Sequence, residues 1–347
     1  MEKIIDPIDK NLIKSELTVQ KRVRTTNKAN NEIYVFTAHD SPNLMREVGR
    51  LREIAFRHYG GGTGLEADID QYDTMDVPYR QLIVWDPENE EILGGYRFIY
   101  GSDVEFNEQN KPMLATAHLY NFSEQFITDY LPHTVELGRS FVSLEYQSTL
   151  LGRKGIFALD NLWDGLGALT VIDPGIRYFF GKVTMYGTYN KDARNMILYF
   201  LHKHFPDTEK LVTPIDPLMT NTDISRMKQL FTGKKFSEDY RILNKEVRAL
   251  GYNIPPLINA YMSLSPTMRF FGTAVNDEFG DVEESGILIE IDQILEEKRA
   301  RHIESYLKSN PSKRFLMLLR KRIAGTTGRR KMKLPQLKRG KRQKNKG

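Results

Sequence analysis

Hydrophobic and polar positions along the chain follow two spacings, which predict short strands interspersed with helices. Runs rich in β-branched and aromatic residues predict strands at 33–36, 81–85, 92–100, 135–145 and 176–186. Turn residues at 86–90 separate the second and third of these runs, which indicates an antiparallel hairpin. Apolar residues at i, i+4, i+7 and i+11 predict a helix that begins after Ser41-Pro42 and contains Leu44, Val48, Leu51 and Ala55.

Further helices are predicted at 123–130, along the apolar segment that follows residue 155, and at 191–204. The resulting order of β, α, β-hairpin, β, α, β and α implies a mixed α/β sheet with helices on its faces. Residues 222–264 are predicted to be mainly helical, followed by a strand at 287–291 and a charged helix at 292–307. The acid-rich segment 63–80 is too polar for a core by this reasoning and is predicted to be a loop.

The chain is therefore divided into four parts. Residues 1–31 are expected to form a flexible basic arm, and residues 32–235 the main α/β domain. Residues 236–310 are expected to form an α/β extension packed on that domain, and residues 311–347 a basic, largely disordered tail.

The net charge changes this picture because it is unevenly distributed. The formal charge of the 347 residues is +5, with 50 Lys and Arg against 45 Asp and Glu. Residues 320–347 contain 13 of the basic residues and no acid, which leaves 37 basic and 45 acidic residues, a net −8, in residues 1–319. An acidic body thus carries a basic tail, which we expect to be attracted to polyanions such as an anionic membrane surface.

Several classes of protein are excluded by the composition. With no Cys, the chain has no disulfide, no thiolate zinc site and no cysteine nucleophile, which fits a reducing compartment. Residues 1–14 lack the apolar centre of a signal peptide, so we expect a cytoplasmic protein. No run of 18 apolar residues occurs, so any membrane contact is expected to be peripheral.

Two charged residues lie in an otherwise apolar predicted strand, at Glu136 and Arg139. Strict alternation would place them on opposite faces of the sheet, but a bulge at Gly138 would bring both toward one cleft. Such a bulge would also free backbone N–H groups for a developing oxyanion. A structural ion pair explains the same spacing equally well.

A second arginine, Arg97, follows the glycine pair of Gly94-Gly95-Tyr96-Arg97 on the neighbouring predicted strand. Two arginines at one cleft suggest a clamp for a carboxylate or a phosphate, although a surface arginine on a hairpin is also an ordinary finding. Asp68, Asp70 and Asp73 lack the glycine and the terminal Glu of a calcium loop, so no metal site is expected.

The turn Gly152-Arg153-Lys154-Gly155 lies between a predicted strand and a predicted helix. Its glycines permit a tight turn, and its two cations and the helix N-terminus could hold a phosphate. Glycine-rich turns of this kind also occur without any ligand, so the turn alone does not decide its role.

Together these pieces resemble one family of enzymes. Its pattern is matched by Leu51-Arg52-x-x-x-Phe56, Asp70-x-Tyr72-Asp73, Gly94-Gly95-Tyr96-Arg97, Glu136-Leu137-Gly138-Arg139-Ser140-Phe141-Val142, Tyr240-Arg241-x-Leu243, Gly251-Tyr252-x-Ile254-Pro255-Pro256-Leu257 and Asp277-x-Phe279-Gly280. The pattern is similar to that of the acyl-carrier-protein-dependent N-acyltransferases of the ornithine-lipid type, often labelled hemolysin-like, and more distantly to the acyl-homoserine lactone synthases. Among these, the chain resembles most the bacterial branch that acylates glycine to give a lyso-lipid. The resemblance covers roughly residues 33–305 and departs from the ornithine-lipid enzymes at Tyr79-Arg80-Gln81, where they typically carry a histidine.

The resemblance implies a GNAT fold and direct transfer of a 3-hydroxyacyl chain from acyl-carrier protein to the amino group of glycine or a similar small amino acid. It needs no bound cofactor, because the acyl-carrier thioester is a co-substrate. Glu136 would be the base, directly or through one water, and backbone N–H groups at Gly138 would hold the oxyanion.

The remaining residues of the pattern would bind the two substrates. Arg139 and Arg97 would grip the amino-acid carboxylate, or one of them would serve structurally through Asp70 or Asp73, and Arg52 and Ser140 would belong to the same substrate site. Gly152, Arg153, Lys154 and Gly155 would hold the phosphopantetheine phosphate.

Other functions remain open at this point. The acceptor could be ornithine or another amino acid, or the enzyme could be a CoA-dependent acetyltransferase or a homoserine lactone synthase. A non-enzymatic, membrane-active protein is the last alternative, because membrane lysis needs neither a Glu/Arg strand nor a phosphate turn. The basic tail is expected to hold the enzyme at the inner membrane surface rather than to bind a specific nucleic acid, each cation contributing about 1 kcal/mol near an anionic leaflet.

Overall fold

One twisted sheet organises the protein, as the computed structural model of the chain shows. The structure describes residues 1–147 and 153–309, and for residues 153–156 and 309 it describes the backbone alone. The sheet has eight strands in the order β1-β2-β3-β4-β6-β7-β10-β9. Their bounds are β1 Arg22–Thr25, β2 Glu32–Phe36, β3 Arg80–Asp86, β4 Glu91–Tyr100, β6 Thr134–Val142, β7 Tyr178–Met185, β9 Arg269–Asn276 and β10 Val282–Glu290. All neighbours are antiparallel except β6 and β7, which run parallel, so the predicted mixed α/β sheet is confirmed.

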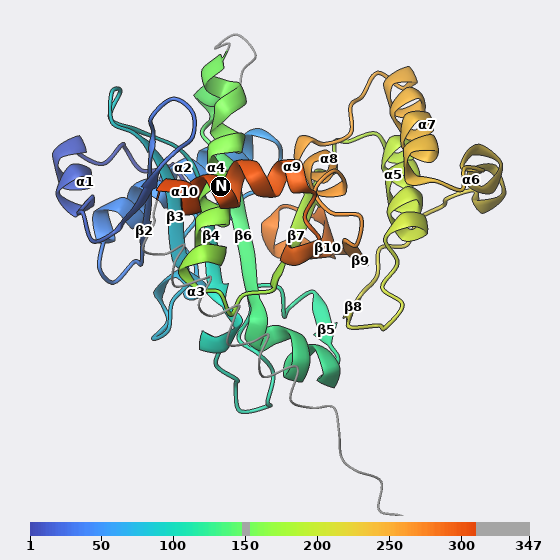
Figure 1. The fold of residues 1–347 in the computed structure, drawn as a ribbon, viewed down its shortest axis with the longest axis horizontal. Coiled ribbons are helices and arrows are strands. Elements are labelled where there is room, and N and C mark those ends of the chain that lie inside the picture. Colours follow the sequence, from blue (N-terminus) through green and yellow to red (C-terminus); the bar gives the residue numbers. More distant parts are fainter. Residues whose placement is uncertain (148–152, 310–347) are drawn as a thin grey trace, which may run out of the picture.

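The central strands are buried on both faces, which explains their nearly continuous apolar sequence. In β3, Leu82 and Val84 pack into the apolar cluster that contains α4 (Arg153–Ile172), whereas Ile83 and Trp85 pack into the cluster that contains α2 (Pro42–His58). The period of two along the strand therefore distributes its side chains between two cores. Figure 1 shows α4 standing in front of the central strands, with α9 and α10 crossing over it.

The described part of the chain contains ten named α-helices, including those predicted after Ser41-Pro42 and at 191–204. Their bounds are α1 Lys10–Glu16, α2 Pro42–His58, α3 Gln71–Thr74, α4 Arg153–Ile172, α5 Lys191–His204, α6 Ile224–Leu230, α7 Phe236–Ala249, α8 Pro256–Met262, α9 Glu296–Arg299 and α10 Ser305–Ser309. The helix predicted at 292–307 begins at Glu296 and consists of α9, a π-helical turn at residues 300–304 and α10. None of the described helices is long and apolar enough to cross a membrane.

A smaller layer lies on the same face of the sheet as α2 and covers the part of that face that α2 does not reach. It contains residues 101–133 and a two-stranded sheet of β5 (Tyr120–Phe122) and β8 (Val212–Pro214), in the lower part of Figure 1. A third apolar cluster fills the space beneath it and includes Tyr79, Leu114, Tyr120 and Phe180. This layer closes one end of the face on which the charged residues of the sheet lie.

Residues 236–310 differ from the predicted extension. The expected helices are present, and the strand predicted at 287–291 largely coincides with β10. This part also contributes β9, and β10 pairs with β7 over eight register positions from Glu283 to Glu290. The C-terminal part therefore completes the main sheet instead of packing on its outside. The strand β9 was missed because its sequence, RFFGTAVN, follows a proline-containing turn and shows no regular alternation.

Residues 1–31 do not form the expected flexible arm. They contain α1 and the edge strand β1, and the side chains of Arg24, Thr26 and Asn31 are buried. Asn27 donates from its backbone N–H and from its side chain to Asp164 of α4, at 2.7 Å each. The prediction failed because contacts with distant elements attach this segment to the body, including these hydrogen bonds and the side chain of Ile13, which is buried in the apolar cluster that contains α2.

Candidate active site

A bulge in β6 shapes the site. Arg97 of β4 lies opposite Gly138, while Gly95 lies opposite Phe141, so β6 has one extra residue between the two positions. The extra residue is accommodated where Arg139 adopts a left-handed backbone with φ of 45°. The bulge predicted at Gly138 is therefore present, and its strained residue is the next one along the strand.

The bulge directs the charged side chains of β4 and β6 to one face of the sheet, the face covered by α2. Leu137 and Tyr96 point into the core beneath α4, whereas Arg97 and Arg139 both reach Asp70 on the opposite side. Glu136 lies on the same face and contacts residues 115–116. The prediction that Glu136 and Arg139 share one face thus holds in the structure.

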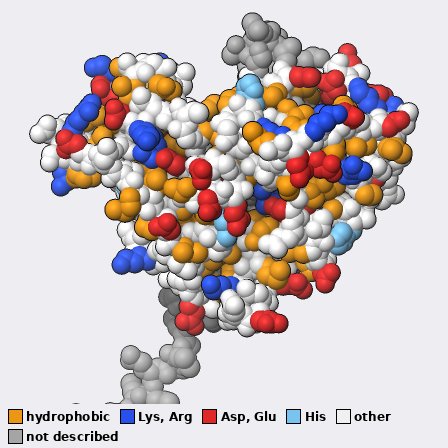
Figure 2. Space-filling model, turned by 180° about the vertical axis from the view of Figure 1, so that it is seen from behind, with side chains coloured by type: hydrophobic (Ala, Val, Ile, Leu, Met, Phe, Trp, Pro, Cys, Tyr) orange, Lys and Arg blue, Asp and Glu red, His pale blue; other side chains and the backbone are white. Residues whose placement is uncertain are grey.

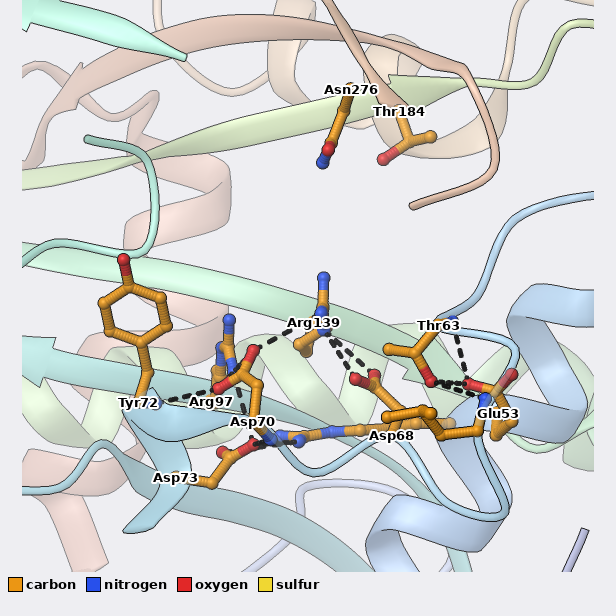
Figure 3. A network of polar contacts seen from close by, with 12 residues as sticks. Glu53, Thr63, Asp68, Asp70, Tyr72, Asp73, Arg97, Arg139, Thr184 and Asn276 are labelled. Carbon is orange, nitrogen blue, oxygen red and sulfur yellow. Dashed lines mark hydrogen bonds and ion pairs between the residues drawn. The ribbon is translucent and has the colours of Figure 1, made fainter. Parts of the chain in front are cut away.

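The arginines of this face form a buried network with three aspartates (Figure 3). Arg97 Nη1 donates to both oxygens of Asp70 at 2.7 Å and to Asp73 at 3.3 Å. Arg139 Nε lies 2.9 Å from Asp68 Oδ2, and its Nη2 lies 3.4 Å from Asp70. Arg52 is completely buried, 3.4 Å from Asp73. The aspartates neutralise the arginines, which is the condition for burying so many charges together.

The acid-rich segment 63–80 is accordingly not the exposed loop predicted from its polarity. Asp68 and Asp73 have no exposed surface, and Asp70 caps α3 by accepting from the backbone N–H of Tyr72 at 2.9 Å. Burial raises the pKa of Asp68 despite Arg139. For Asp70, burial also acts to raise the pKa, but Arg97 and Arg139 outweigh it and lower the value to about 2.

Part of the network is available to a ligand. Arg139 retains 11% of its side-chain surface and Asp70 26%, whereas Arg52 and Asp73 retain none. Within the described residues, the buried Nε of Arg97 has no hydrogen-bond partner. A Cβ built on Gly138 would lie 3.5 Å from that Nε, so the side chain of Arg97 packs closely beside the glycine. Among the three arginines of the network, Arg139 has the largest exposed surface, so an acceptor such as a carboxylate could reach it.

Glu136 lies in a closed environment. Oε1 accepts from the backbone N–H and the hydroxyl of Thr116 at 3.1 and 2.6 Å, and Oε2 accepts from Tyr79 Oη and from the backbone N–H of Ala115. Burial raises the pKa of Glu136, while Thr116 and Tyr79 act to lower it. All three donor residues are themselves buried. Its role as base stays a prediction, because one of these donors would have to leave before another group could reach the carboxylate.

Behind the bulge, the sheet divides and a cavity forms. The parallel β6 and β7 pair only from Thr134 with Tyr178 to Leu137 with Gly181, and then separate. The cavity at this split is lined by Tyr96, Leu137, Gly138, Ser140, Phe179, Phe180, Gly181, Lys182, Tyr261, Ile287 and Ile289. Ser140, predicted to share the substrate site with the arginines, lines this cavity instead, because the bulge turns it away from the network.

The predicted phosphate turn cannot be placed in the same way. Gly152 lies outside the described residues, and Arg153, Lys154 and Gly155 are described only as the first backbone turn of α4. Elsewhere in the described chain, no group of three or more His, Asp or Glu is arranged to hold a metal ion.

A second charged cluster faces the network and was missed by the sequence reasoning. Lys182 of β7 forms an ion pair with Glu284 of β10, and Glu284 also accepts from Thr184 Oγ1 and Asn276 Nδ2 at 3.2 Å each. Figure 3 shows Thr184 and Asn276 on the opposite side of Arg139 from Asp73. The signal was available, because Lys182 is the one charged residue of a strand with the sequence YFFGKVTM, the same criterion that identified Glu136 and Arg139.

Comparison with known proteins agrees with this geometry. The model of a family described as an acetyltransferase (GNAT) domain matches residues 51–152, which include the C-terminal part of α2, the aspartate segment and β3 to β6. A protein of Phocaeicola vulgatus named glycine N(alpha)-acyltransferase is 66% identical over 311 residues, 90% of this chain and 95% of the relative. A protein of the same name from Bacteroides thetaiotaomicron is 65% identical over 311 residues, 90% of this chain and 92% of the relative.

No solved structure gives a significant match. Identity at this level over nearly the whole length of both relatives, together with the split sheet and the bulge, establishes the family. The chain is a GNAT-fold acyltransferase that belongs to the same family as the glycine N(alpha)-acyltransferases of these two bacteria.

Proposed function

We propose that this protein transfers a fatty acyl chain, such as a 3-hydroxyacyl chain, from acyl-carrier protein to the α-amino group of glycine. The observation that carries the proposal is the 66% identity to a protein named glycine N(alpha)-acyltransferase over 90% of the chain. The site supports it, because the network of arginines and aspartates lies next to Gly138, which also lines the apolar cavity at the split between β6 and β7. The product, an N-acylglycine, would be formed in the first step of glycine-lipid synthesis.

The charged network would bind glycine through its carboxylate. Arg139 is partly exposed and would donate to the carboxylate, and the buried Arg97 would add its positive charge from beside Gly138. Asp70 keeps both arginines in place through ion pairs. Arg52, completely buried and bound to Asp73 and Gln81, would support the site without touching glycine. Bidentate arginine contacts of this kind distinguish an amino acid from a simple amine.

The split between the strands would admit the acyl-phosphopantetheine arm. The cavity there is lined mainly by apolar and aromatic side chains, as an acyl chain requires. Backbone N–H groups released by the bulge at residues 138–140 would face the thioester oxygen as negative charge develops on it. The turn Gly152 to Gly155 remains our proposed contact for the phosphate, with its two cations giving an acidic carrier protein a local attraction.

The basic tail is proposed to bring the enzyme to its membrane. On the face shown in Figure 2, acidic and basic side chains are interspersed, and residues 1–319 have a net charge of −8. The 13 cations of residues 320–347 therefore supply the attraction to an anionic leaflet that the body lacks. An enzyme with an amphiphilic product would gain from working next to the bilayer.

The proposal is tested with purified protein and 3-hydroxyacyl-carrier protein, offered glycine, ornithine or serine in turn, with the products identified by mass spectrometry. N-acylglycine should dominate. Acylation of ornithine or serine instead would refute the choice of amino acid. Equal use of acetyl-CoA would refute the choice of donor, and lysis of vesicles without any transfer would support the membrane-active alternative.

A further inference from the structure

Lys182 lies where the cavity borders the face of the sheet that carries Arg97 and Arg139. The last paired residues of β6 and β7 are Leu137 and Gly181, so Lys182 is the first residue of β7 beyond the pairing. It lines the cavity together with Gly138, and its ammonium group pairs with Glu284 on the face of the sheet that carries Arg97 and Arg139. A group at this junction can reach both an acyl thioester and an amine held by the arginines.

Glu284 fixes the position of Lys182. Its side chain is only 2% exposed and is itself held by Thr184 and Asn276. The side chain of Lys182, by contrast, keeps 10% of its surface, and Thr184 beside it is also partly exposed. The carboxylate of Glu284 is therefore less accessible than the ammonium group that it holds.

The surroundings favour a neutral lysine more than an exposed position would. Burial lowers the pKa of Lys182, Arg139 and Arg97 lower it further, and Glu284 opposes them. His118, from the segment that covers this face, is a further titratable group beside Lys182. Burial lowers the pKa of this histidine, Lys182 lowers it further, and Glu278 and Glu284 oppose them. Tyr120 and Tyr186 also lie near Glu284, and burial raises the pKa of both. Lysines tuned in this way serve as general bases near neutral pH.

Glu136 has no comparable access. Its four acceptor positions are occupied by Tyr79, Ala115 and Thr116, which form a closed layer around it. We infer that Lys182 is the residue that takes the proton from the attacking amine and returns it to the departing sulfur, with Glu284 as its positioning residue. The inference rests on the proposed acyl transfer and names the proton acceptor for it.

The step balances without any other reactant. The nitrogen of the neutral glycine amine forms a bond to the thioester carbon while its proton passes to the neutral Nζ of Lys182. The carbon–sulfur bond then breaks, and the lysine ammonium gives the proton to the thiolate of the phosphopantetheine. The products are the amide and the free thiol of the carrier, and Lys182 is again neutral. A thiol pKa of about 8.5 makes a lysine of lowered pKa a suitable donor for the last transfer.

Two substitutions at Lys182 separate proton transfer from charge. Lys182→Arg keeps the positive charge and a partner for Glu284 but cannot lose a proton at working pH. Lys182→Met keeps the length and removes the charge. If Lys182 transfers the proton, both variants should lower kcat by about 100-fold or more, the usual contribution of general acid–base catalysis, while KM for glycine changes little. An arginine variant that retains wild-type kcat would overturn the inference, because charge alone would then suffice.

A change at Glu284 tests the positioning role through the pH profile of kcat, measured with saturating glycine. Removing the carboxylate in Glu284→Gln removes the factor that raises the pKa of Lys182, so the rise of activity with pH should move to lower pH. Because the bound amine would also lie near Glu284, the same change is made in the Lys182→Arg background, where a shift of the residual activity would come from the amine and not from Lys182. Glu283→Gln is the matched control, since Glu283 on the same strand pairs with Arg194 of α5, and its profile should follow the wild type.

The outcomes are distinct from those of the proposed function. If Glu284→Gln loses both the activity and the pH-dependent rise while Lys182→Arg stays active, Glu284 is the proton acceptor and the inference fails. If the wild type acylates an amine other than glycine, the proposed substrate fails, and the same variants measured with that amine decide the role of Lys182. Circular dichroism and denaturant midpoints of each variant show whether lost activity is lost folding.

Discussion

Replacing Glu136 by Gln separates a structural role of this residue from a catalytic one. The carboxylate accepts four hydrogen bonds, two on each oxygen, and connects β6 to the covering segment at residues 115–116. Glutamine has nearly the same shape but offers one acceptor oxygen and one donor group. Two of the present donors would therefore face an N–H₂ group.

The cost depends on which oxygen is replaced. If the amide nitrogen takes the place of Oε1, the backbone N–H of Thr116 loses its acceptor and cannot turn away. If it takes the place of Oε2, Tyr79 can rotate its hydroxyl, and the N–H of Ala115 still donates to Tyr79 Oη at 2.8 Å. The second arrangement is cheaper, and it loses two hydrogen bonds to a charged acceptor, so we expect a loss of about 1–3 kcal/mol in the free energy of unfolding.

Urea unfolding followed by circular dichroism measures this loss, and acyl transfer is measured well below the unfolding midpoint. We expect a lower midpoint and a kcat within about tenfold of wild type, which is less than the contribution of a general base. The comparison variant Thr116→Val removes one donor to Oε1 and should show the same pattern. A Glu136→Gln protein of wild-type stability whose kcat falls by about 100-fold or more would refute our reasoning and restore Glu136 as the base.

Four other predictions follow from single contacts. Asp70→Asn should reduce stability at neutral pH by about 2 kcal/mol, the equivalent of lowering the pKa of this carboxyl from 3.8 to about 2; because the lowered value stabilises the fold only above it, the difference from wild type should disappear in urea titrations as the pH falls from about 4 towards 2. Asn27→Ala should expose β1 to hydrogen exchange, since Asn27 links this segment to Asp164, and unchanged protection would contradict that link. Gly181→Ala should lower the free energy of unfolding by about 1–3 kcal/mol, because a Cβ there would lie 2.6 Å from the carbonyl oxygen of Leu137. By contrast, Gly138→Ala should unfold like wild type and raise KM for glycine. Deleting residues 325–347 should abolish co-sedimentation with anionic vesicles and leave turnover on soluble substrates unchanged, and a truncated protein that still sediments would exclude the tail as the tether.

Local sequence was sufficient for the elements with a strong local pattern. The helix α5 at Lys191–His204 was predicted from apolar residues that repeat at helical spacing, and β3 and β4 were predicted from runs of β-branched and aromatic residues on either side of a turn. The bulge in β6 was predictable for a related reason. Two charges three residues apart in an apolar strand can share one face only if the alternation is interrupted.

Burial by ion pairing was not predictable from any single segment. The aspartates of segment 63–80 are polar enough for a surface loop, and they are buried because arginines on three other elements, α2, β4 and β6, converge on them. Residues 1–31 are attached in the same way, through Asn27 and the distant Asp164. In both cases the partner lies far away in sequence, and no periodic pattern records its presence.

The bulge also explains how one sheet can bring two unlike substrates together. Because Arg139 occupies the extra position, Arg139 faces the polar network and Ser140 faces the apolar cavity on the other side of the sheet. An amino acid held by the arginines and an acyl chain in the cavity would thus approach from opposite faces. They can meet only where the sheet is open, beyond the last pair of β6 and β7. Gly138 and Lys182 border that opening, one with no side chain and one with a buried amine, so on the proposed function the acyl transfer would occur between them.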